Sequence, residues 1–206
     1  MEVNNKDHWY DGLFYDKFIA PHQDISFDLL KDLIEDNSTL IDAGCGTGRL
    51  AFRLADKCKK IVGVDLSERN INVAKTNLSK SSLQNIEFHH ADINKFNVNP
   101  GTLFDYAVIS YAIHEIEEGD RKQTLNSLAG MAKEIIIIDY LIPQPNISLN
   151  ILSEIVEFFA GWEHYRNYKS FLRNKGIEGL AKSNGLKIVR EIKNAPLTSH
   201  IALLSK

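Results

Sequence analysis

A glycine-rich loop, DAGCGTG at residues 42–48, carries the most specific chemical signal in the chain. It follows a short apolar segment at residues 39–41 and precedes a segment with helical spacing of apolar residues. Its glycines let the backbone turn tightly and bring N–H groups against a ligand at the start of a helix. The Asp42 carboxylate beside the loop would repel a pyrophosphate but attract an ammonium group. The loop therefore favours a ligand that has an amino acid end.

A second acidic residue supplies another contact for such a ligand. Asp65 ends the apolar segment 60–65 and lies 17 residues after Gly48. A carboxylate at that position can accept hydrogen bonds from both hydroxyls of a ribose. The glycine spacing differs from the Gly-x-Gly-x-x-Gly of dinucleotide binders, which disfavours the alternative of an NAD-dependent dehydrogenase. The two motifs together predict a nucleoside-containing cofactor.

Two titratable residues, His114 and Glu115, follow a predicted strand at residues 104–110. In open α/β sheets, ligands bind outside the carboxyl ends of the strands, at the point where the strand order reverses. Either side chain could therefore be a catalytic general base that takes a proton from a reacting group. The alternative is that Glu115 belongs to a solvated acidic loop at residues 115–120 and that His114 is structural.

The histidines and cysteines show no metal-binding pattern along the sequence. His89 and His90 are adjacent in a predicted strand and therefore point to opposite faces of the sheet. The other histidines, at positions 8, 22, 114, 164 and 200, have no ligand spacing. Cys45 and Cys58 form no Cys-x-x-Cys pair. The sequence therefore predicts no metal site.

Alternating strands and helices must position these groups. The predicted strands are residues 39–43, 60–65, 86–91, 104–110, 134–140, 187–192 and 198–204. The predicted helices are residues 24–36, 49–57, 120–132, 148–161 and 168–184, with one more that begins after the N-cap residue Ser67. Strands that alternate with helices indicate βαβ units and a parallel sheet, and the short turn between the last two strands indicates antiparallel pairing.

Composition narrows the class of protein. The chain has 206 residues, 44% of them hydrophobic, with a net charge of −3, which is typical of one soluble globular domain. The acidic balance disfavours DNA and anionic membranes as partners. No apolar run is long enough to span a membrane, and no basic and apolar leader begins the chain. We expect a cytoplasmic protein, monomeric or homodimeric, without a membrane partner.

Aromatic residues gather in two segments. Residues 1–24 and 141–185 hold 11 of the 19 aromatic side chains. Such faces could cover an apolar substrate or attract a cationic sulfur through cation–π contact. They could equally pack the two segments against each other. The candidates for the substrate pocket are Tyr10, Tyr15, Tyr111, Trp162 and Tyr165.

The motifs together resemble those of the class I S-adenosylmethionine-dependent methyltransferases. The resemblance is strong over residues 38–140 and extends in outline to residues 186–205. Besides the glycine loop it rests on VGVDLS at 62–67, HADI at 90–93 and FDYAVIS at 104–110. It implies an α/β fold with a doubly wound, mostly parallel seven-stranded sheet, helices on both faces and an antiparallel last strand.

The resemblance also implies the cofactor, S-adenosylmethionine, which becomes S-adenosylhomocysteine, and the residues that bind it. These are Asp42, Gly44, Cys45, Gly46, Asp65, Leu66, Asp92, Ile93 and Ser110. The glycines would face the methionine part, Asp65 the ribose and Ser110 the sulfonium. Leu66 would pack on the adenine and Asp92 would accept from its amino group. The alternative for Asp92 is a cap on the turn after the third strand.

We therefore predict a methyltransferase that acts on a small, partly apolar or aromatic metabolite. Residues 110–113 read SYAI, not the Asn- or Asp-Pro-Pro-Tyr of amino-directed nucleic-acid methyltransferases, which argues against DNA. An RNA or protein methyltransferase and a regulatory, partner-activated SAM-binding module are the alternatives. The chain is expected to be a single domain, residues 1–206. Its cofactor core is residues 25–140, its closing strands are residues 186–206, and its helical lid segments are residues 1–24 and 141–185.

Overall fold

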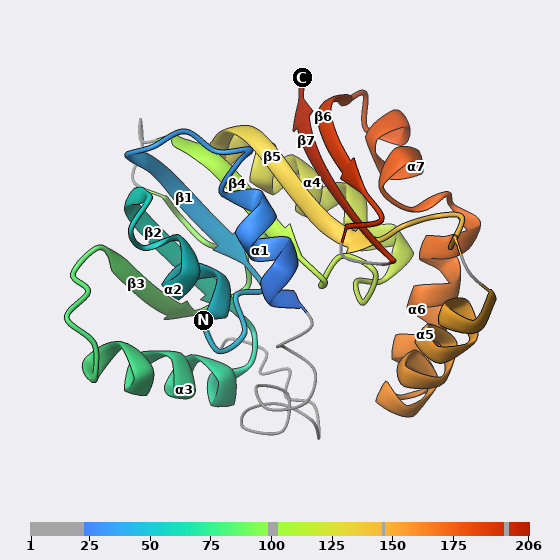
Figure 1. Cartoon of the computed structure of the whole chain (residues 1–206), viewed down its shortest axis with the longest axis horizontal. Coiled ribbons are helices and arrows are strands. Elements are labelled where there is room, and N and C mark those ends of the chain that lie inside the picture. The colour runs from blue at the N-terminus through green and yellow to red at the C-terminus, as the bar shows by residue number, and fades with distance from the viewer. Residues whose placement is uncertain (1–22, 99–102, 146, 196–197) are drawn as a thin grey trace.

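The computed structural model describes residues 23–98, 103–145, 147–195 and 198–206. The described chain forms one seven-stranded sheet with the strand order β3-β2-β1-β4-β5-β7-β6 (Figure 1). The strands are β1 (Ser38–Ala43), β2 (Cys58–Asp65), β3 (Ile86–His90), β4 (Phe104–Ser110), β5 (Ala132–Tyr140), β6 (Lys187–Lys193) and β7 (Ser199–Ser205). The helices are α1 (Asp24–Leu30), α2 (Arg49–Leu54), α3 (Glu68–Ser79), α4 (Glu118–Met131), α5 (Ile147–Ala160), α6 (Trp162–Arg173) and α7 (Gly176–Ser183).

The sheet is parallel except at β7. Strands β1 to β5 pair in parallel, whereas β7 runs antiparallel to both β5 and β6. The strand order reverses at β1, which lies between β2 and β4. This topology confirms the fold predicted from the sequence, including the antiparallel last strand. It also puts the carboxyl ends of β1, β2 and β4 side by side, where such sheets bind ligands.

The central strands are buried on both faces. In β5, the side chains of residues 135 and 137 pack into one hydrophobic cluster and those of residues 136 and 138 into the other. Helices α1, α2 and α3 supply the partners of residues 136 and 138, such as Leu30, Leu50 and Ile71. Helices α4, α6 and α7 cover the opposite face. Because alternate side chains of a strand point to opposite faces, a run of four isoleucines fits only a strand covered on both sides.

The helical segment after β5 differs from the prediction. The expected helix over 168–184 is two helices, because Lys175 and Gly176 adopt left-handed backbone angles with φ of 63° and 57°. A side chain at Gly176 would approach Ile142 to 2.7 Å, so packing as well as the backbone angle requires glycine there. Helix α6 begins at Trp162, well before the predicted start. The first helix ends at Leu30, earlier than the predicted residue 36.

Helices α5 and α6 lie side by side beyond the carboxyl end of β5 (Figure 1). Tyr168 and Phe171 of α6 are fully buried, whereas Phe158 and Phe159 of α5 are more than half exposed. Of the predicted lid at residues 1–24, all but the last two residues lie outside the described residues. No helix in the described part of the chain is long and apolar enough to cross a membrane.

Candidate functional site

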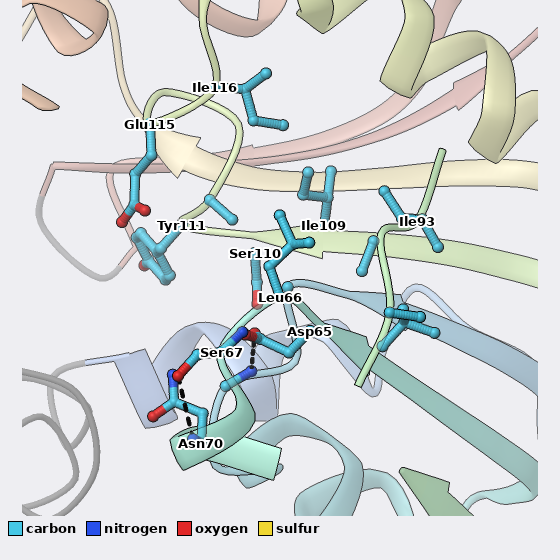
Figure 2. Close-up of a pocket in the computed structure, with 16 residues that line it drawn as sticks. Asp65, Leu66, Ser67, Asn70, Ile93, Ile109, Ser110, Tyr111, Glu115 and Ile116 are labelled. Atoms are coloured by element: carbon cyan, nitrogen blue, oxygen red, sulfur yellow. Dashed lines mark hydrogen bonds between the residues drawn. The ribbon is translucent and has the colours of Figure 1, made fainter. Parts of the chain in front are cut away.

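An open cavity lies outside the carboxyl ends of β1, β2 and β4 (Figure 2). Asp65 and Ser67 lie at one side of it, Ile93 at another, and Tyr111 and Glu115 at the far end (Figure 2). Its lining is Ala43, Gly44, Gly46, Val64, Asp65, Leu66, Ser67, Asn70, Ala91, Ile93, Ile109, Ser110, Tyr111, Ala112, Glu115 and Ile116. The cavity therefore occupies the place where the strand order reverses.

The glycine loop between β1 and α2 forms one wall of the cavity. The N–H groups of Gly44 and Cys45 both donate to the carbonyl of Val64, which ties the loop to β2. Gly44 has a φ of 72°, and a side chain there would lie 3.0 Å from the Ala112 Cβ. At Gly48, with a φ of 85°, an added Cβ would meet the Phe88 ring at 2.4 Å. The backbone angles and the packing both require glycine at these two positions.

Asp65 joins the loop to the next helix. One of its carboxylate oxygens accepts from the backbone N–H of Gly46 at 2.8 Å, and the other from that of Ser67 at 2.7 Å. The Asp65 carboxylate also lines the cavity, so it lies against a ligand bound there. The arrangement suits a ligand that offers two adjacent hydroxyl groups.

Asp42, near the end of β1 where the glycine loop begins, is fully buried. Neither of its carboxylate oxygens has a hydrogen-bond partner in the described structure. Burial, with the nearby charge of Asp65, raises the pKa of Asp42 to about 8. A buried carboxyl without a partner is costly, and a cationic group near the loop would lower that cost. The site therefore fits a ligand with an ammonium group at this end.

Tyr111 closes the far end of the cavity. It follows β4 with a left-handed backbone, φ 51°, and its hydroxyl lies 2.7 Å from the hydroxyl oxygens of both Ser26 and Ser199. Burial raises the pKa of the Tyr111 hydroxyl, although both serine contacts favour the anion. This tyrosine thus joins helix α1, the end of β4 and strand β7 at the edge of the cavity.

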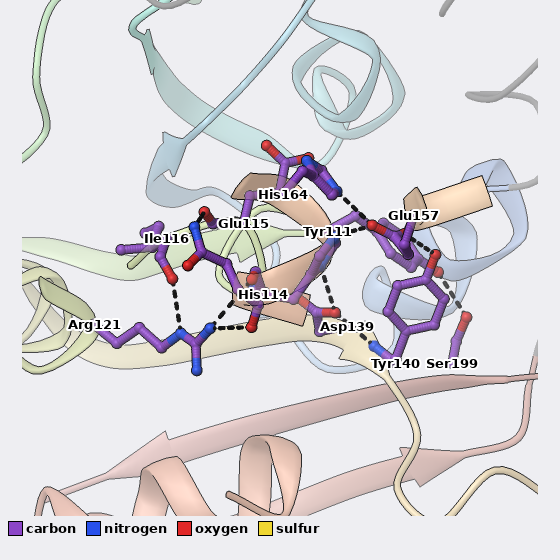
Figure 3. A network of polar contacts seen from close by, with 11 residues as sticks. Tyr111, His114, Glu115, Ile116, Arg121, Asp139, Tyr140, Glu157, His164 and Ser199 are labelled. Carbon is purple, nitrogen blue, oxygen red and sulfur yellow. Dashed lines mark hydrogen bonds and ion pairs between the residues drawn. The ribbon is translucent and has the colours of Figure 1, made fainter. Parts of the chain in front are cut away.

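Glu115 and His114 point in different directions. Glu115 lines the cavity, whereas His114 is 3% exposed and faces β5 (Figures 2 and 3). Its Nδ1 lies 2.8 Å from one oxygen of Asp139, and its Nε2 lies 3.6 Å from Glu157. Burial lowers the pKa of His114, but Asp139 and Glu157 outweigh this and raise it well above the usual value. A histidine that keeps its proton in this way is a poor general base.

Arg121 of α4 holds the segment that carries these two residues. Its guanidinium donates to the carbonyls of His114, at 3.2 Å, and Ile116, at 3.0 Å. It also donates to the carbonyl of Asn167 in α6, at 2.6 Å. The buried arginine therefore fixes the segment after β4 against helix α6.

Comparison with known proteins identifies the family. A family model described as a methyltransferase domain matches residues 34–202, most of the chain. The chain belongs to the class I S-adenosylmethionine-dependent methyltransferases. An uncharacterized methyltransferase of Schizosaccharomyces pombe is 27% identical over 148 residues, which cover 70% of this chain and 93% of the relative.

Two further comparisons define how far the likeness extends. A tRNA (uracil-5-)-methyltransferase homolog A of mouse is 38% identical over 56 residues, which cover 27% of this chain and only 9% of that relative. The crystal structure of magnesium protoporphyrin IX methyltransferase of Synechocystis PCC 6803, with bound SAH, has a TM-score of 0.64 at 19% identity. That match covers 97% of this chain and 89% of the other, and it supports the methyltransferase fold.

The cofactor of the family is S-adenosylmethionine, and six of the nine residues predicted to bind it line the cavity. These six are Gly44, Gly46, Asp65, Leu66, Ile93 and Ser110. Asp42 and Cys45 belong to the same glycine-rich segment but are buried and are not part of the lining. Asp92 is outside the lining. Its carboxylate accepts from the N–H of Asn94 at 2.9 Å and lies 3.4 Å from Lys95 Nζ, which is the turn-capping arrangement that the sequence left open.

Most of the described residues predicted for the substrate pocket do not line the cavity. Of the substrate-pocket candidates, Tyr111 lines the cavity, but Trp162 is 71% exposed and neither it nor Tyr165 is part of the lining. Tyr10 and Tyr15 lie outside the described residues. The prediction from the sequence did not include Asn70, which lies in the first turn of α3 and lines the methyltransferase cavity. The helix start at Ser67 was the available signal, because a first turn after β2 must open toward the same edge of the sheet.

Proposed function

We propose that this protein transfers a methyl group from S-adenosylmethionine to a small-molecule acceptor bound beside Tyr111 and Glu115. The observation that carries the proposal is the division of the cavity into two ends. The glycine loop and Asp65 form one end, with groups that suit the nucleoside and amino acid parts of the cofactor. Tyr111, Ala112, Glu115 and Ile116 form the other end, which leaves room for an acceptor.

The cofactor end supports this proposal through three groups. Asp65 would accept from the ribose hydroxyls while it continues to hold the Gly46 N–H. The Asp42 carboxyl has no hydrogen-bond partner among the described residues, and the ammonium group of the methionine part would stabilise its charged form. The bound cofactor supplies a sulfonium methyl carbon that is already activated, so the protein's task is to position the acceptor and exclude water.

Glu115 would serve as the general base for an acceptor that carries a proton. As the acceptor atom forms its bond to the methyl carbon, the carbon–sulfur bond breaks and sulfur leaves as a neutral thioether. The proton of the acceptor O–H or N–H passes to the Glu115 carboxylate. The position of Glu115 in the cavity lining supports this role. His114 lies between the carboxylates of Asp139 and Glu157, which argues against His114 as the general base.

The acceptor is proposed to be small and partly apolar. The walls at its end of the cavity include Ile109, Ala112 and Ile116 beside the Tyr111 ring. Residues 141–185, as part of a single methyltransferase domain, would form the segment that selects the acceptor. The aromatic side chains of Phe158, Phe159 and Trp162 support this role, because they are more than half exposed on α5 and α6.

A labelling experiment tests the proposal. The protein is incubated with S-adenosylmethionine carrying a tritiated methyl group and, separately, with small-molecule, RNA and protein fractions of a cell extract. We expect label in the small-molecule fraction and a loss of that label in the Glu115→Gln variant. Label confined to RNA or protein would overturn the acceptor class. Cofactor binding without label in any fraction would favour the regulatory-module alternative.

A further inference from the structure

Four metal-ligand side chains converge next to the cavity. His114 and Glu115 follow β4, Glu157 belongs to α5 and His164 to α6 (Figure 3). One ligand atom from each of His114, Glu115 and His164 lies within 4.8 Å of the others. Glu157 Oε2 lies 3.6 Å from His114 Nε2 and accepts a hydrogen bond from His164 Nε2. Chain spacing concealed this cluster, because its members come from three separate elements.

A second layer of groups orients the cluster. Both oxygens of Asp139 lie within 3.0 Å of His114 Nδ1, so that Nε2 is the nitrogen that faces Glu157. The Tyr140 hydroxyl donates to Glu157 Oε1 at 2.6 Å, which leaves Oε2 toward the two histidines. A carboxylate behind a histidine, and a hydrogen-bonded carboxylate beside it, are the usual outer partners of metal ligands.

The carboxylates of the cluster outnumber its histidines. Asp139, Glu157 and Glu115 form ion pairs only with the two histidines, as far as the described residues reach. Asp139 is 0% exposed and Glu157 4% exposed. Part of this charge is compensated, because Asp139 attracts the buried Arg121 and accepts two backbone N–H groups, and Glu157 accepts the Tyr140 hydroxyl. A bound cation would compensate the carboxylates further, since buried charges are costly without a cation or hydrogen bonds.

We propose that His114, Glu115 and His164 bind one divalent transition-metal ion of the zinc type. Glu115 lies beside Nδ1 of His164, and Glu157 holds the opposite nitrogen, Nε2, as an outer partner. Imidazole nitrogens combined with carboxylates suit zinc and its first-row neighbours, whereas Mg²⁺ and Ca²⁺ prefer oxygen ligands alone. An imidazole binds a metal ion through an unprotonated nitrogen, so binding of the ion displaces any proton from that nitrogen to solvent.

The proposed ion would lie at the acceptor end of the cavity, because Glu115 lines that cavity. A carboxylate can bind an ion through one oxygen, so the second oxygen of Glu115 remains for the acceptor. The inference concerns the chain's own ligands and holds whether or not the proposed methyl transfer takes place.

The test is a titration of the full-length protein, stripped of metal by a chelator, with Co²⁺ and Zn²⁺ in the absence of S-adenosylmethionine. We expect one ion bound per chain by calorimetry and a visible Co²⁺ spectrum typical of nitrogen and oxygen ligands. The Glu157→Gln and His164→Ala variants should bind at least about tenfold more weakly, as should Asp139→Asn through its effect on His114. His89→Ala is the matched control, since His89 pairs with Glu87 on β3 and lies outside the cluster.

Two results would overturn the inference. One is the absence of a saturable Co²⁺ spectrum in the parent protein. The other is equal affinity for Co²⁺ in the parent and in the Glu115→Gln variant. Residue 115 is half-buried at the cavity edge, and the comparison is made with a variant whose melting temperature matches that of the parent. Calorimetry with S-adenosylmethionine on the same samples separates failure of the metal site from failure of the cofactor site.

Discussion

The carboxylate of Asp65, at the end of β2, accepts the backbone N–H of Gly46, in the loop after β1, at a distance of 2.8 Å. The residue proposed to bind the ribose therefore also fixes the loop proposed to bind the methionine part. Because both contacts use the same carboxylate, the two halves of the cofactor site form one unit. A substitution of Asp65 should therefore weaken the binding of the methionine part of the cofactor as well as that of the ribose.

Asp42→Asn should raise the stability of the free protein at neutral and alkaline pH. The carboxyl has a pKa of about 8 when folded, against about 4 in an unfolded chain, so the folded state holds more protons between these values. The contribution of the Asp42 carboxyl to the free energy of unfolding is fully present below about pH 4, and it is lost as the pH rises toward 8. Melting curves should show the variant at least about 3 °C above the parent at pH 8. Asp36→Asn, which removes an exposed carboxyl, is the control. The same pH dependence of the melting temperature in the parent and in Asp42→Asn would refute the account.

Tyr111→Phe should destabilise the protein by about 1–3 kcal/mol, because the Ser26 and Ser199 hydroxyls each lose a partner in a part-buried place. Urea denaturation measures the change. Tyr165→Phe is the comparison, since that hydroxyl makes a longer bond of 3.3 Å to Glu154. Equal effects in the two variants would mean that the Tyr111 hydroxyl does not join α1 to β7.

Gly48→Ala should cost more than about 1 kcal/mol of stability, because its left-handed backbone disfavours a side chain and the Cβ would meet the Phe88 ring. Gly130→Ala, in helix α4 with open space around the added carbon, should be neutral or stabilise by up to about 1 kcal/mol. Thermal unfolding of the two variants gives the comparison. A loss of stability at residue 130 similar to that at residue 48 would contradict the packing argument.

Glu115→Gln should lower turnover by about 10²–10⁴-fold while S-adenosylmethionine affinity changes little, since the carboxylate acts on the acceptor. Initial rates with labelled cofactor, paired with calorimetry, measure both quantities. Glu117→Gln, at an exposed position two residues on, is the control. Unchanged turnover in Glu115→Gln would remove the residue from the reaction.

The fold and the cavity wall formed by the glycine loop and Asp65 could be predicted from the sequence because their signals are local. The glycine loop, the acidic end of β2 and the N-cap Ser67 each depend on a few neighbouring residues. The surroundings of the opposite end of the cavity could not be predicted in the same way. His114, Glu157 and His164 meet only because α5 and α6 pack beside β5, and no spacing along the chain encodes that packing. The break at Lys175 and Gly176 likewise lies where the chain packs close to Ile142, a residue distant in the sequence.

Calorimetric titration of the parent protein and the Asp65→Ala variant with S-adenosylmethionine tests the central claim most directly. We predict saturable binding of one cofactor per chain in the parent and at least about tenfold weaker binding in the variant, equivalent to about 1.4 kcal/mol or more. A folded parent that binds no S-adenosylmethionine, or a variant that binds it as tightly as the parent, would contradict the assignment of this cavity as the cofactor site.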